Sequence, residues 1–460
     1  MPEPVEKRSG QRYMPGLDGL RAIAVLSVIA YHLEVGFAPG GLLGVGVFFT
    51  LSGYLITDIL LEGWATRKLS LKNFWLARAR RLLPALFTML AVVLIWVWIG
   101  NPDLLGTLRG ETISSIFFVE NWWAIAQNMS YFDRFGAPSP MSHLWSLAVE
   151  EQFYIVWPWL LLLLLKISPA KDHGKRARRE RIRPNLALIT LGLAFISASL
   201  MAVLYTPGFD TTRVYEGTDT RAFALLFGAA LAMVWPSRRL DPVLPAKARR
   251  NMDLLGVGAL AVILLLVWQT SELQPFLYRG GLVILAIATT ILVAVLAHPA
   301  TRLGPIIGCR PLRWIGVRSY AIYLWQLPII ILTTPAGSPG FHPLRAPVQV
   351  AAIFLVAALM AVLLGFSPKF GALIQAIPLP VMGGVSIVVF GLIAVAGAKI
   401  WVDNKVDFSE NRNLIVAAVT LVLGTGDFTL KFGPFALGGI GTATFGAILL
   451  YALLSCRKGR

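Results

Sequence analysis

The chain has 460 residues, of which 56% are apolar and 14% are charged, whereas soluble domains are about 45–50% apolar and about 25% charged. This composition excludes a purely soluble protein, and two cysteines are too few for a disulfide scaffold. The formal charge of +17 would suit a nucleic-acid binder, but most basic residues fall between apolar blocks, as in membrane proteins. We therefore expect a lipid bilayer, and no nucleic acid, among the partners.

Apolar blocks close to the length that crosses a bilayer, about 20 residues, recur along the chain. Ten of them lie at 17–36, 41–61, 82–100, 147–165, 186–205, 221–235, 253–270, 280–297, 317–334 and 347–366, and three more at 379–400, 413–424 and 435–455. A weaker stretch at 113–126 contains Glu120, Asn121 and two tryptophans, so we expect it at the outer face or re-entrant. The predicted fold class is all-α: a polytopic membrane helix bundle of ten spans, with about three more in the tail.

The basic loops predict the orientation of these spans, because Lys and Arg in short loops stay on the cytoplasmic side. With a cytoplasmic N-terminus, the inner loops 62–81, 166–185, 236–250 and 299–318 carry six, eight, five and four Lys or Arg residues. The outer loops 100–146, 206–219, 271–279 and 335–346 carry two, one, one and one. This contrast favours a cytoplasmic N-terminus and ten crossings up to residue 366.

The first span contains two residues with useful chemistry, Arg21 and His32, which are eleven positions apart. On a helix this spacing is just over three turns, so both side chains share one face, about 16 Å apart along the axis. Arginine binds phosphate or carboxylate with a fixed fork, and histidine can remove a hydroxyl proton near neutral pH. The pair suits a long phosphorylated donor whose reactive carbon lies near the histidine. The alternative is that Arg21 reaches the inner interface and His32 lies in the outer headgroup layer.

Five groups of residues along the chain, including this pair, form a larger pattern. They are Arg21 and His32; Phe48, Phe49, Ser52 and Gly53; Arg78, Arg81 and Pro84; the run from His143 to Tyr154; and, towards residue 360, Asp219, Arg221, Ser319, Tyr320, Trp325 and Pro328. Together they resemble the acyltransferase-3 family of bacterial membrane acyltransferases.

The resemblance implies an enzyme of the bacterial inner membrane that moves an acyl group from acyl-CoA, acetyl-CoA included, to a hydroxyl. The acceptor would be a cell-surface glycan or a lipid-linked molecule. His32 would be the base or acyl relay and Arg21 would hold the donor. The motifs also mark Ser52, His143, Ser146 and Tyr320 as supporting residues. We expect no bound cofactor and no metal, since the sequence contains no metal-ligand cluster, Walker loop or dinucleotide fingerprint.

Two further sets of charged residues are candidates, each with an alternative. Glu150 and Glu151, at the outer end of the fourth span, are predicted to lie at the depth of the catalytic histidine and to orient its imidazole; the alternative is solvation at the interface. Arg78, Arg80 and Arg81 face the cytoplasm, where acyl-CoA is made, and would bind its phosphates. Their alternative role is to anchor the first inner loop at the membrane surface.

The chain departs from the family at three places. Members often have Asp where this chain has Gly46, and His where it has Gln326, so the polar group usual in the family is replaced at each position. After residue 360 the expected Ser-Tyr-x-x-x-Glu-x-Pro motif does not occur. These departures leave Arg21 and His32 in place.

The tail carries a second resemblance. Residues 365–456 contain Pro368, Phe370, Pro378, Pro380, Gly383 and Gly384 in an order that resembles the C-terminal end of bacterial uracil permeases, of the nucleobase-transporter family. The carboxylates Asp403, Asp407, Glu410 and Asp427 lie in loops, so none is carried over as a substrate ligand. We predict an acyltransferase-like domain at 1–366 and permease-like helices at 367–460. The alternative function is a nucleobase transporter-related protein or a non-functional hybrid.

The orientation of the tail stays open in the sequence. In permeases the stretch from Pro380 enters the membrane from outside, whereas ten spans leave residue 366 inside. Either residues 365–378 make a short return crossing, or 347–366 does not cross, or the tail is inverted. A join of two membrane families near residue 365 is a natural fusion, an engineered chimera or a sequence artefact.

Overall fold

The computed structural model describes residues 13–127, 139–167, 184–335 and 340–366, and in the tail 407, 410–425, 430–432, 435–437, 446–447 and 450–451. The chain divides into two compact units, Met1–Ser367 and Pro368–Arg460. The basic residues predicted to orient the loop after the fourth span lie mostly at 171–183, outside the described residues, as does the predicted span 379–400.

Long helices make up the first unit. They are α1 (Pro15–His32), α2 (Gly44–Ala65), α3 (Leu71–Gly100), α6 (Leu144–Ile167), α8 (Pro184–Leu204), α10 (Thr218–Val234), α11 (Ala246–Gln269), α12 (Leu282–Ala297), α15 (Ser319–Leu332) and α16 (Arg345–Phe366). Shorter helices connect them: α4 (Leu105–Ile116), α5 (Glu120–Ala126), α9 (Thr212–Glu216), α13 (Leu303–Ile307) and α14 (Arg310–Val317), with single turns at Gly41–Leu43, Pro102–Leu104, Ser237–Arg239 and Leu277–Gly281.

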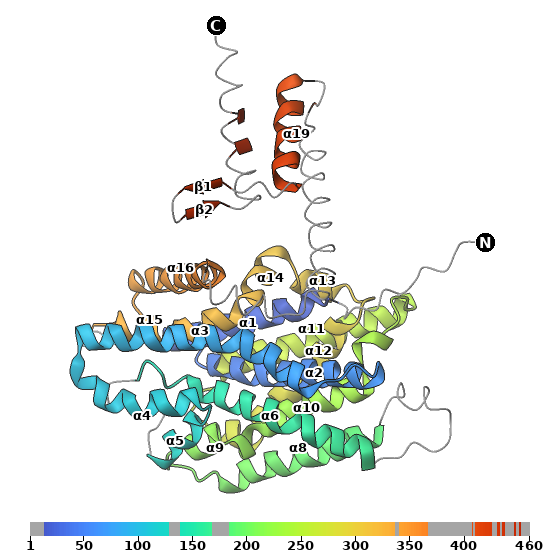
Figure 1. Ribbon diagram of the computed structural model, residues 1–460. Helices are drawn as coiled ribbons and strands as arrows, with labels where there is room; N and C mark the ends of the chain where they lie inside the picture. Colours follow the sequence, from blue (N-terminus) through green and yellow to red (C-terminus); the bar gives the residue numbers. More distant parts are fainter. Residues whose placement is uncertain are drawn as a thin grey trace. The chain divides into compact units, whose positions relative to one another are not determined.

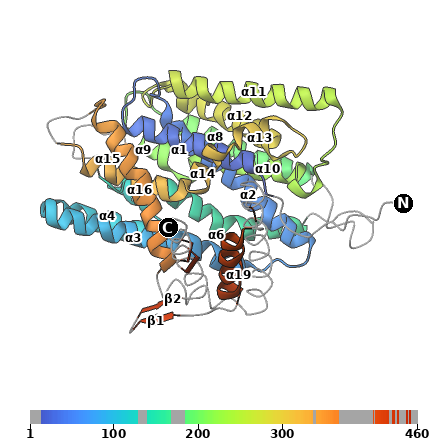
Figure 2. The same ribbon diagram turned by 90° about the horizontal axis from the view of Figure 1, so that it is seen from above.

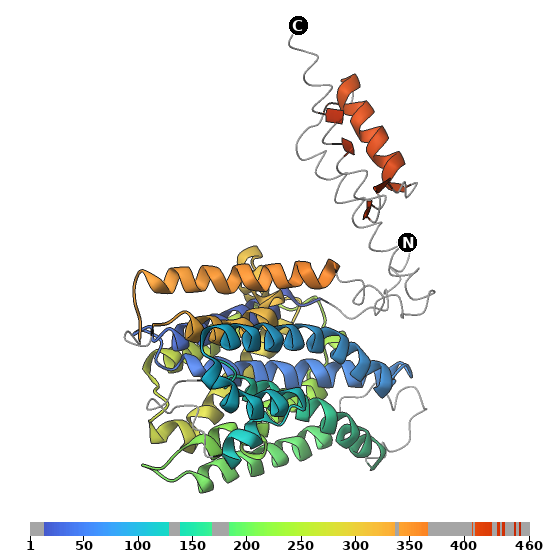
Figure 3. The same ribbon diagram turned by 60° about the vertical axis from the view of Figure 1, so that its left-hand side comes forward.

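The long helices lie side by side in one bundle. α16 lies at one edge of it and α8 at the opposite edge (Figures 1 and 3). Seen from above, α11 and α3 lie on opposite sides (Figure 2). α2 and α10 lie at the centre, since 78% and 72% of their most apolar segments are buried.

Seven of the described helices are long and apolar enough to cross a membrane, and the bent pair α14–α15, with a bend of 71°, would make eight. A multi-pass membrane bundle is therefore confirmed, whereas the predicted number of ten spans is not. A helix covers each of the ten predicted apolar blocks. However, Asp18, Arg21 and His32 make α1 too polar for a candidate span. The apolar segment Arg345–Met360 of α16 is shorter than the candidate spans.

Glycines allow the two central helices to touch. A Cβ atom at Gly53 of α2 would lie 1.8 Å from the carbonyl oxygen of Leu225, and one at Gly228 of α10 would lie 2.0 Å from that of Thr50. Both distances are far below van der Waals contact, so any larger residue would push the helices apart. Small residues at such crossings are how membrane helices achieve close packing.

The weak stretch 113–126 falls on α4 and α5, and neither helix is among the candidate spans. Asn121 of α5 is held by α6, because the Gln152 side chain donates to its Oδ1 at 2.9 Å and to the carbonyl oxygen of Phe118 at 2.8 Å. The described structure thus agrees with a stretch that does not cross as a separate helix.

The second unit contains α19 (Asn411–Thr425), which covers the predicted span 413–424, and a hairpin of β1 (Leu430–Phe432) and β2 (Phe435–Leu437). The strands pair antiparallel, with Leu430 opposite Leu437. The described helices confirm the predicted all-α class, and the hairpin is a local exception: a strand lies at 435–437, where a helical span was predicted to begin. Gly433 and Pro434 separate the two strands in the sequence, and these residue types favour turns over helices.

Candidate active site

The two predicted key residues lie on one helix, as their spacing requires. Arg21 is in the second turn of α1, where it lies 3.9 Å from the carboxylate of Asp18, and His32 is the last residue of the helix. Eleven residues at 1.5 Å each separate them by about 16 Å along the axis. The helix thus presents a cation at one level of the bundle and an imidazole at another.

The imidazole of His32 is oriented by an amide from α15. Its Nδ1 lies 2.7 Å from Oε1 of Gln326, whose side chain is fully buried. With the amide oxygen as the partner, which only accepts hydrogen bonds, the proton is assigned to Nδ1 and Nε2 to the basic role. Gln326 therefore provides an acceptor at one of the positions where the chain departs from the family.

A second histidine lies close to this pair. His143, just before α6, is fully buried, and its Nε2 donates to the carbonyl oxygen of Leu324 at 3.1 Å. Because Nε2 donates to this carbonyl oxygen, the ring proton is on Nε2 and Nδ1 is left as an acceptor, and His32 is its ionisable neighbour. The Nδ1 atom has no hydrogen-bond partner among the described residues.

The hydroxyls around His143 attach the start of α6 to α15. The Ser146 and Tyr323 oxygens lie 2.6 Å apart, and Tyr323 donates to the carbonyl oxygen of His143 at 3.1 Å. Since Tyr323 and Gln326 belong to the same helix, this contact helps to fix the amide that orients His32. The predicted supporting residues His143 and Ser146 thus lie near His32.

Glu150 does not lie at the depth of His32, where it was predicted. The carboxylate accepts from the Ser52 hydroxyl at 2.9 Å and lies 3.5 Å from the Tyr154 hydroxyl, and its cationic neighbours are Arg21 and Arg78. Glu150 is six residues into α6, about 9 Å beyond its start, and the start of the helix already lies beside α15. The carboxylate therefore belongs to the level of Arg21, and the orienting group at His32 is Gln326.

Glu151 lies in the same region, with Glu150 and Arg78 as its charged neighbours. Ser52, predicted as a supporting residue, comes from the central helix α2 and contacts the Glu150 carboxylate directly. The structure thus brings three of the predicted residues to the Arg21 end of the site and separates them from His32.

Two of the three arginines of α3 join this group. Arg81 has Arg21 and Arg78 as charged neighbours, and the guanidinium of Arg78 lies over the rings of Phe74 and Tyr154, at 5.8 and 5.6 Å from their centroids. Arg80 is two residues from Arg78, which places it about 200° away around the helix, on a different face. The cluster formed by Arg21, Arg78 and Arg81 is called the arginine cluster below.

Tyr320 connects the arginine cluster to α15. Its hydroxyl donates to the carbonyl oxygen of Leu82 at 2.9 Å, and Arg81 is among its charged neighbours. The side chain therefore ties α15 to α3. Arginines in this arrangement can bind phosphate groups through charge-assisted hydrogen bonds.

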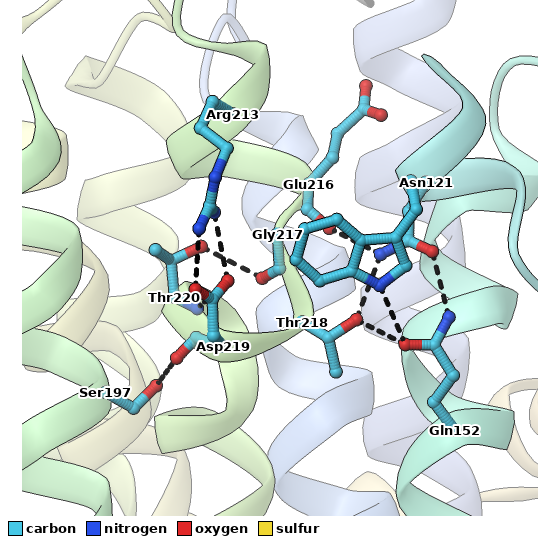
Figure 4. Close-up of polar contacts among 10 residues, drawn as sticks. Asn121, Gln152, Ser197, Arg213, Glu216, Gly217, Thr218, Asp219 and Thr220 are labelled. Atoms are coloured by element: carbon cyan, nitrogen blue, oxygen red, sulfur yellow. Dashed lines mark hydrogen bonds and ion pairs between the residues drawn. The ribbon is translucent and has the colours of Figure 1, made fainter. Parts of the chain in front are cut away.

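A polar network on the α5, α6, α9 and α10 helices was not predicted (Figure 4). Asn121 donates to the Thr218 hydroxyl at 2.9 Å, and Thr218 donates to the Gln152 side chain at 2.5 Å. Arg213 pairs with Asp219 at 2.6 Å. These contacts fix the start of α10 by side chains far apart in the sequence, so helical spacing alone gives no signal for them.

Comparison with known proteins identifies both parts of the chain. Residues 14–367 match the Acyltransferase domain family, and residues 347–432 match the Permease family. The two resemblances seen in the sequence are thereby confirmed. The first match covers most of the chain and the second only its end.

Curated relatives resemble the first part. A peptidoglycan O-acetyltransferase OatA of Listeria monocytogenes is 50% identical over 357 residues, which are 76% of this chain and 55% of the relative. A putative peptidoglycan O-acetyltransferase YrhL of Bacillus subtilis is 47% identical over 352 residues, 75% of this chain and 54% of the relative. An O-acetyltransferase OatA of Staphylococcus aureus is 39% identical over 360 residues, 78% of this chain and 57% of the relative. The chain spans about half the length of these relatives, and by its match over residues 14–367 it belongs to the acyltransferase-3 family.

Proposed function

We propose that the chain is a membrane O-acetyltransferase that transfers an acetyl group to a hydroxyl of a cell-wall glycan. The observation that carries this proposal is the His32 imidazole, oriented by Gln326 at 2.7 Å on the helix that also carries Arg21. The family match and the names of the relatives, which include peptidoglycan O-acetyltransferases, support the group and the acceptor class.

The donor in this proposal is acyl-CoA, in the form of acetyl-CoA, with its phosphates bound by the arginine cluster. His32 takes the hydroxyl proton of the acceptor at Nε2 while the acceptor oxygen attacks the thioester carbonyl. The carbon–sulfur bond then breaks, and the thiolate leaves and receives the proton. In the relay form of the mechanism, Nε2 itself first carries the acyl group.

Glu150 and Glu151 have a different role in this scheme from the one predicted for them. Glu150 lies near Arg21 and Arg78, and Glu151 lies near Arg78, so the two side chains hold the arginines of the cluster in place. Ser52 positions Glu150 through its 2.9 Å hydrogen bond. Arg80 anchors α3 at the membrane surface.

We place the protein in the bacterial cytoplasmic membrane with its N-terminus on the cytoplasmic side. The contrast in basic residues between alternate loops supports this orientation. It puts the arginine cluster near the compartment where acyl-CoA is made and His32 near the outer face, where a glycan acceptor lies.

Replacing His32 with alanine tests the function. We expect the variant to insert into the membrane as the natural chain does and to transfer no acetyl group, measured by mass spectrometry of cell-wall glycans from cells with and without each gene. His342→Ala is the matched control, because this histidine is exposed. Acetylated glycan at natural levels in the His32→Ala strain would refute the proposal.

A further inference from the structure

A second arginine is buried in the bundle, away from the arginine cluster. Arg221 of α10 has no exposed surface. Its guanidinium lies over three aromatic rings, at 5.6 Å from the centroid of Phe49, 5.9 Å from Trp145 and 4.8 Å from Tyr215. Three helices, α2, α6 and α9, thus build an aromatic cage around one cation.

The cation has no hydrogen-bond partner in the described part of the chain. Its Nε, Nη1 and Nη2 atoms are all buried and unpaired there. A guanidinium stays protonated in proteins, and the desolvation of a charge is offset only by good partners. Aromatic faces supply part of that attraction but accept no full hydrogen bond.

The carboxylates close to Arg221 in the sequence do not neutralise it. Asp219 is paired with Arg213 at 2.6 Å (Figure 4), and the charged neighbours of Glu216 are Glu120 and Asp210. The ionisable side chains that act on Arg221 are the phenols of Tyr215 and Tyr278. The phenol of Tyr278 donates to the carbonyl oxygen of Glu272 at 2.9 Å, so it is not an anion.

One side of the guanidinium faces a glycine. A Cβ atom at Gly46 of α2 would lie 3.9 Å from Nη2 of Arg221 and 2.8 Å from Cδ2 of Leu285. The side chain of Leu285 therefore lies close to this position, and Gly46 itself adds no side chain beside the guanidinium. A small group can reach the donors of Arg221 from this side when the flexible end of Leu285 shifts.

We propose that Arg221 is the cation of a buried site for a small monovalent anion, a carboxylate or a halide, beside Gly46 and Leu285. The guanidinium fork matches a carboxylate in two parallel hydrogen bonds. This site is separate from the arginine cluster and needs no acyl donor.

The test measures the thermal unfolding of the purified full chain in detergent, at constant ionic strength, in sodium chloride, sodium acetate and the bulky sodium gluconate. A ligand that binds only the folded state raises the unfolding temperature saturably. We expect chloride or acetate to raise it by several degrees over gluconate, and the comparison of the two identifies the anion. Equal unfolding temperatures in all three salts would overturn the proposal.

Substitutions at Gly46 test the position of the site. Gly46→Asp places a carboxylate beside Arg221, so this variant should be more stable in gluconate than the natural chain and should lose its response to chloride and acetate. Gly46→Asn is the neutral control of the same size, and Gly46→Ala measures the crowding of Leu285 alone. A Gly46→Asp variant with the full anion response would contradict the assignment, even if Arg221→Gln does not fold.

Discussion

Replacing Gln326 with leucine removes the acceptor that orients His32. The 2.7 Å hydrogen bond is partly buried and joins residues 294 positions apart. Loss of such a bond costs roughly 1–3 kcal/mol when a buried group is left unsatisfied, and each 1.36 kcal/mol corresponds to about tenfold in rate. If the bond holds His32 in its reactive tautomer, acetyl transfer should slow by about 5- to 150-fold in Gln326→Leu.

The assay is the rate of acetyl transfer to glycan fragments by the full chain in membranes. Gln326→His, which keeps an acceptor nitrogen, should stay closer to the natural rate than Gln326→Leu. Gln349→Leu is the control: Gln349 is buried and binds the backbone of Ile330 and the hydroxyls of Thr333 and Thr334, so its loss affects α15 without touching His32. Equal rates for Gln326→Leu and the natural chain would refute the orienting role.

Three further predictions follow from the structure. Arg21→Lys keeps the charge but loses the planar fork, so donor binding should weaken by about 1–3 kcal/mol, seen as a higher KM for acetyl-CoA; an unchanged KM would count against a donor site here. Burial raises the pKa of Glu120 well above its ordinary 4.5, with nearby Glu111 adding to the effect. The folded state keeps this proton while the unfolded chain releases it, so stability should fall as the pH rises above about 4.5. In Glu120→Gln, the unfolding temperature should therefore change less between about pH 5 and 8 than it does in the natural chain. Deleting 367–460 should leave acetyl transfer intact, and the full chain should take up no radiolabelled uracil above empty membranes; uptake that unlabelled uracil competes away would favour the transporter alternative.

Helical spacing predicted the local part of the site. Arg21 and His32 share α1, and the three-residue spacing of Arg78 and Arg81 places both in the arginine cluster. Each of these relations is set within one helix. The period of the helix is sufficient to predict them.

Relations between helices were less accessible from the sequence. The depth of Glu150 was inferred from the end of an apolar block, but α6 begins at Leu144, so Glu150 lies in the second turn and reaches Ser52. Packing decides which helices face each other, and Gln326 reaches His32 through the fit of α15 against α1. The only sequence signal for this contact was the departure from the family at that position.

Two single residues depart from the family, Gln326 and Gly46, and their physical consequences differ. Gln326 keeps a hydrogen-bond acceptor, whereas Gly46 has no side chain. Gln326 still offers an oxygen at 2.7 Å from His32, so the imidazole remains oriented although the residue type differs. Gly46 offers nothing to Arg221, whose three nitrogens are unpaired among the described residues. The first departure therefore leaves the proposed transfer chemistry in place, whereas the second leaves a buried cation whose charge an anion from outside the chain would have to balance.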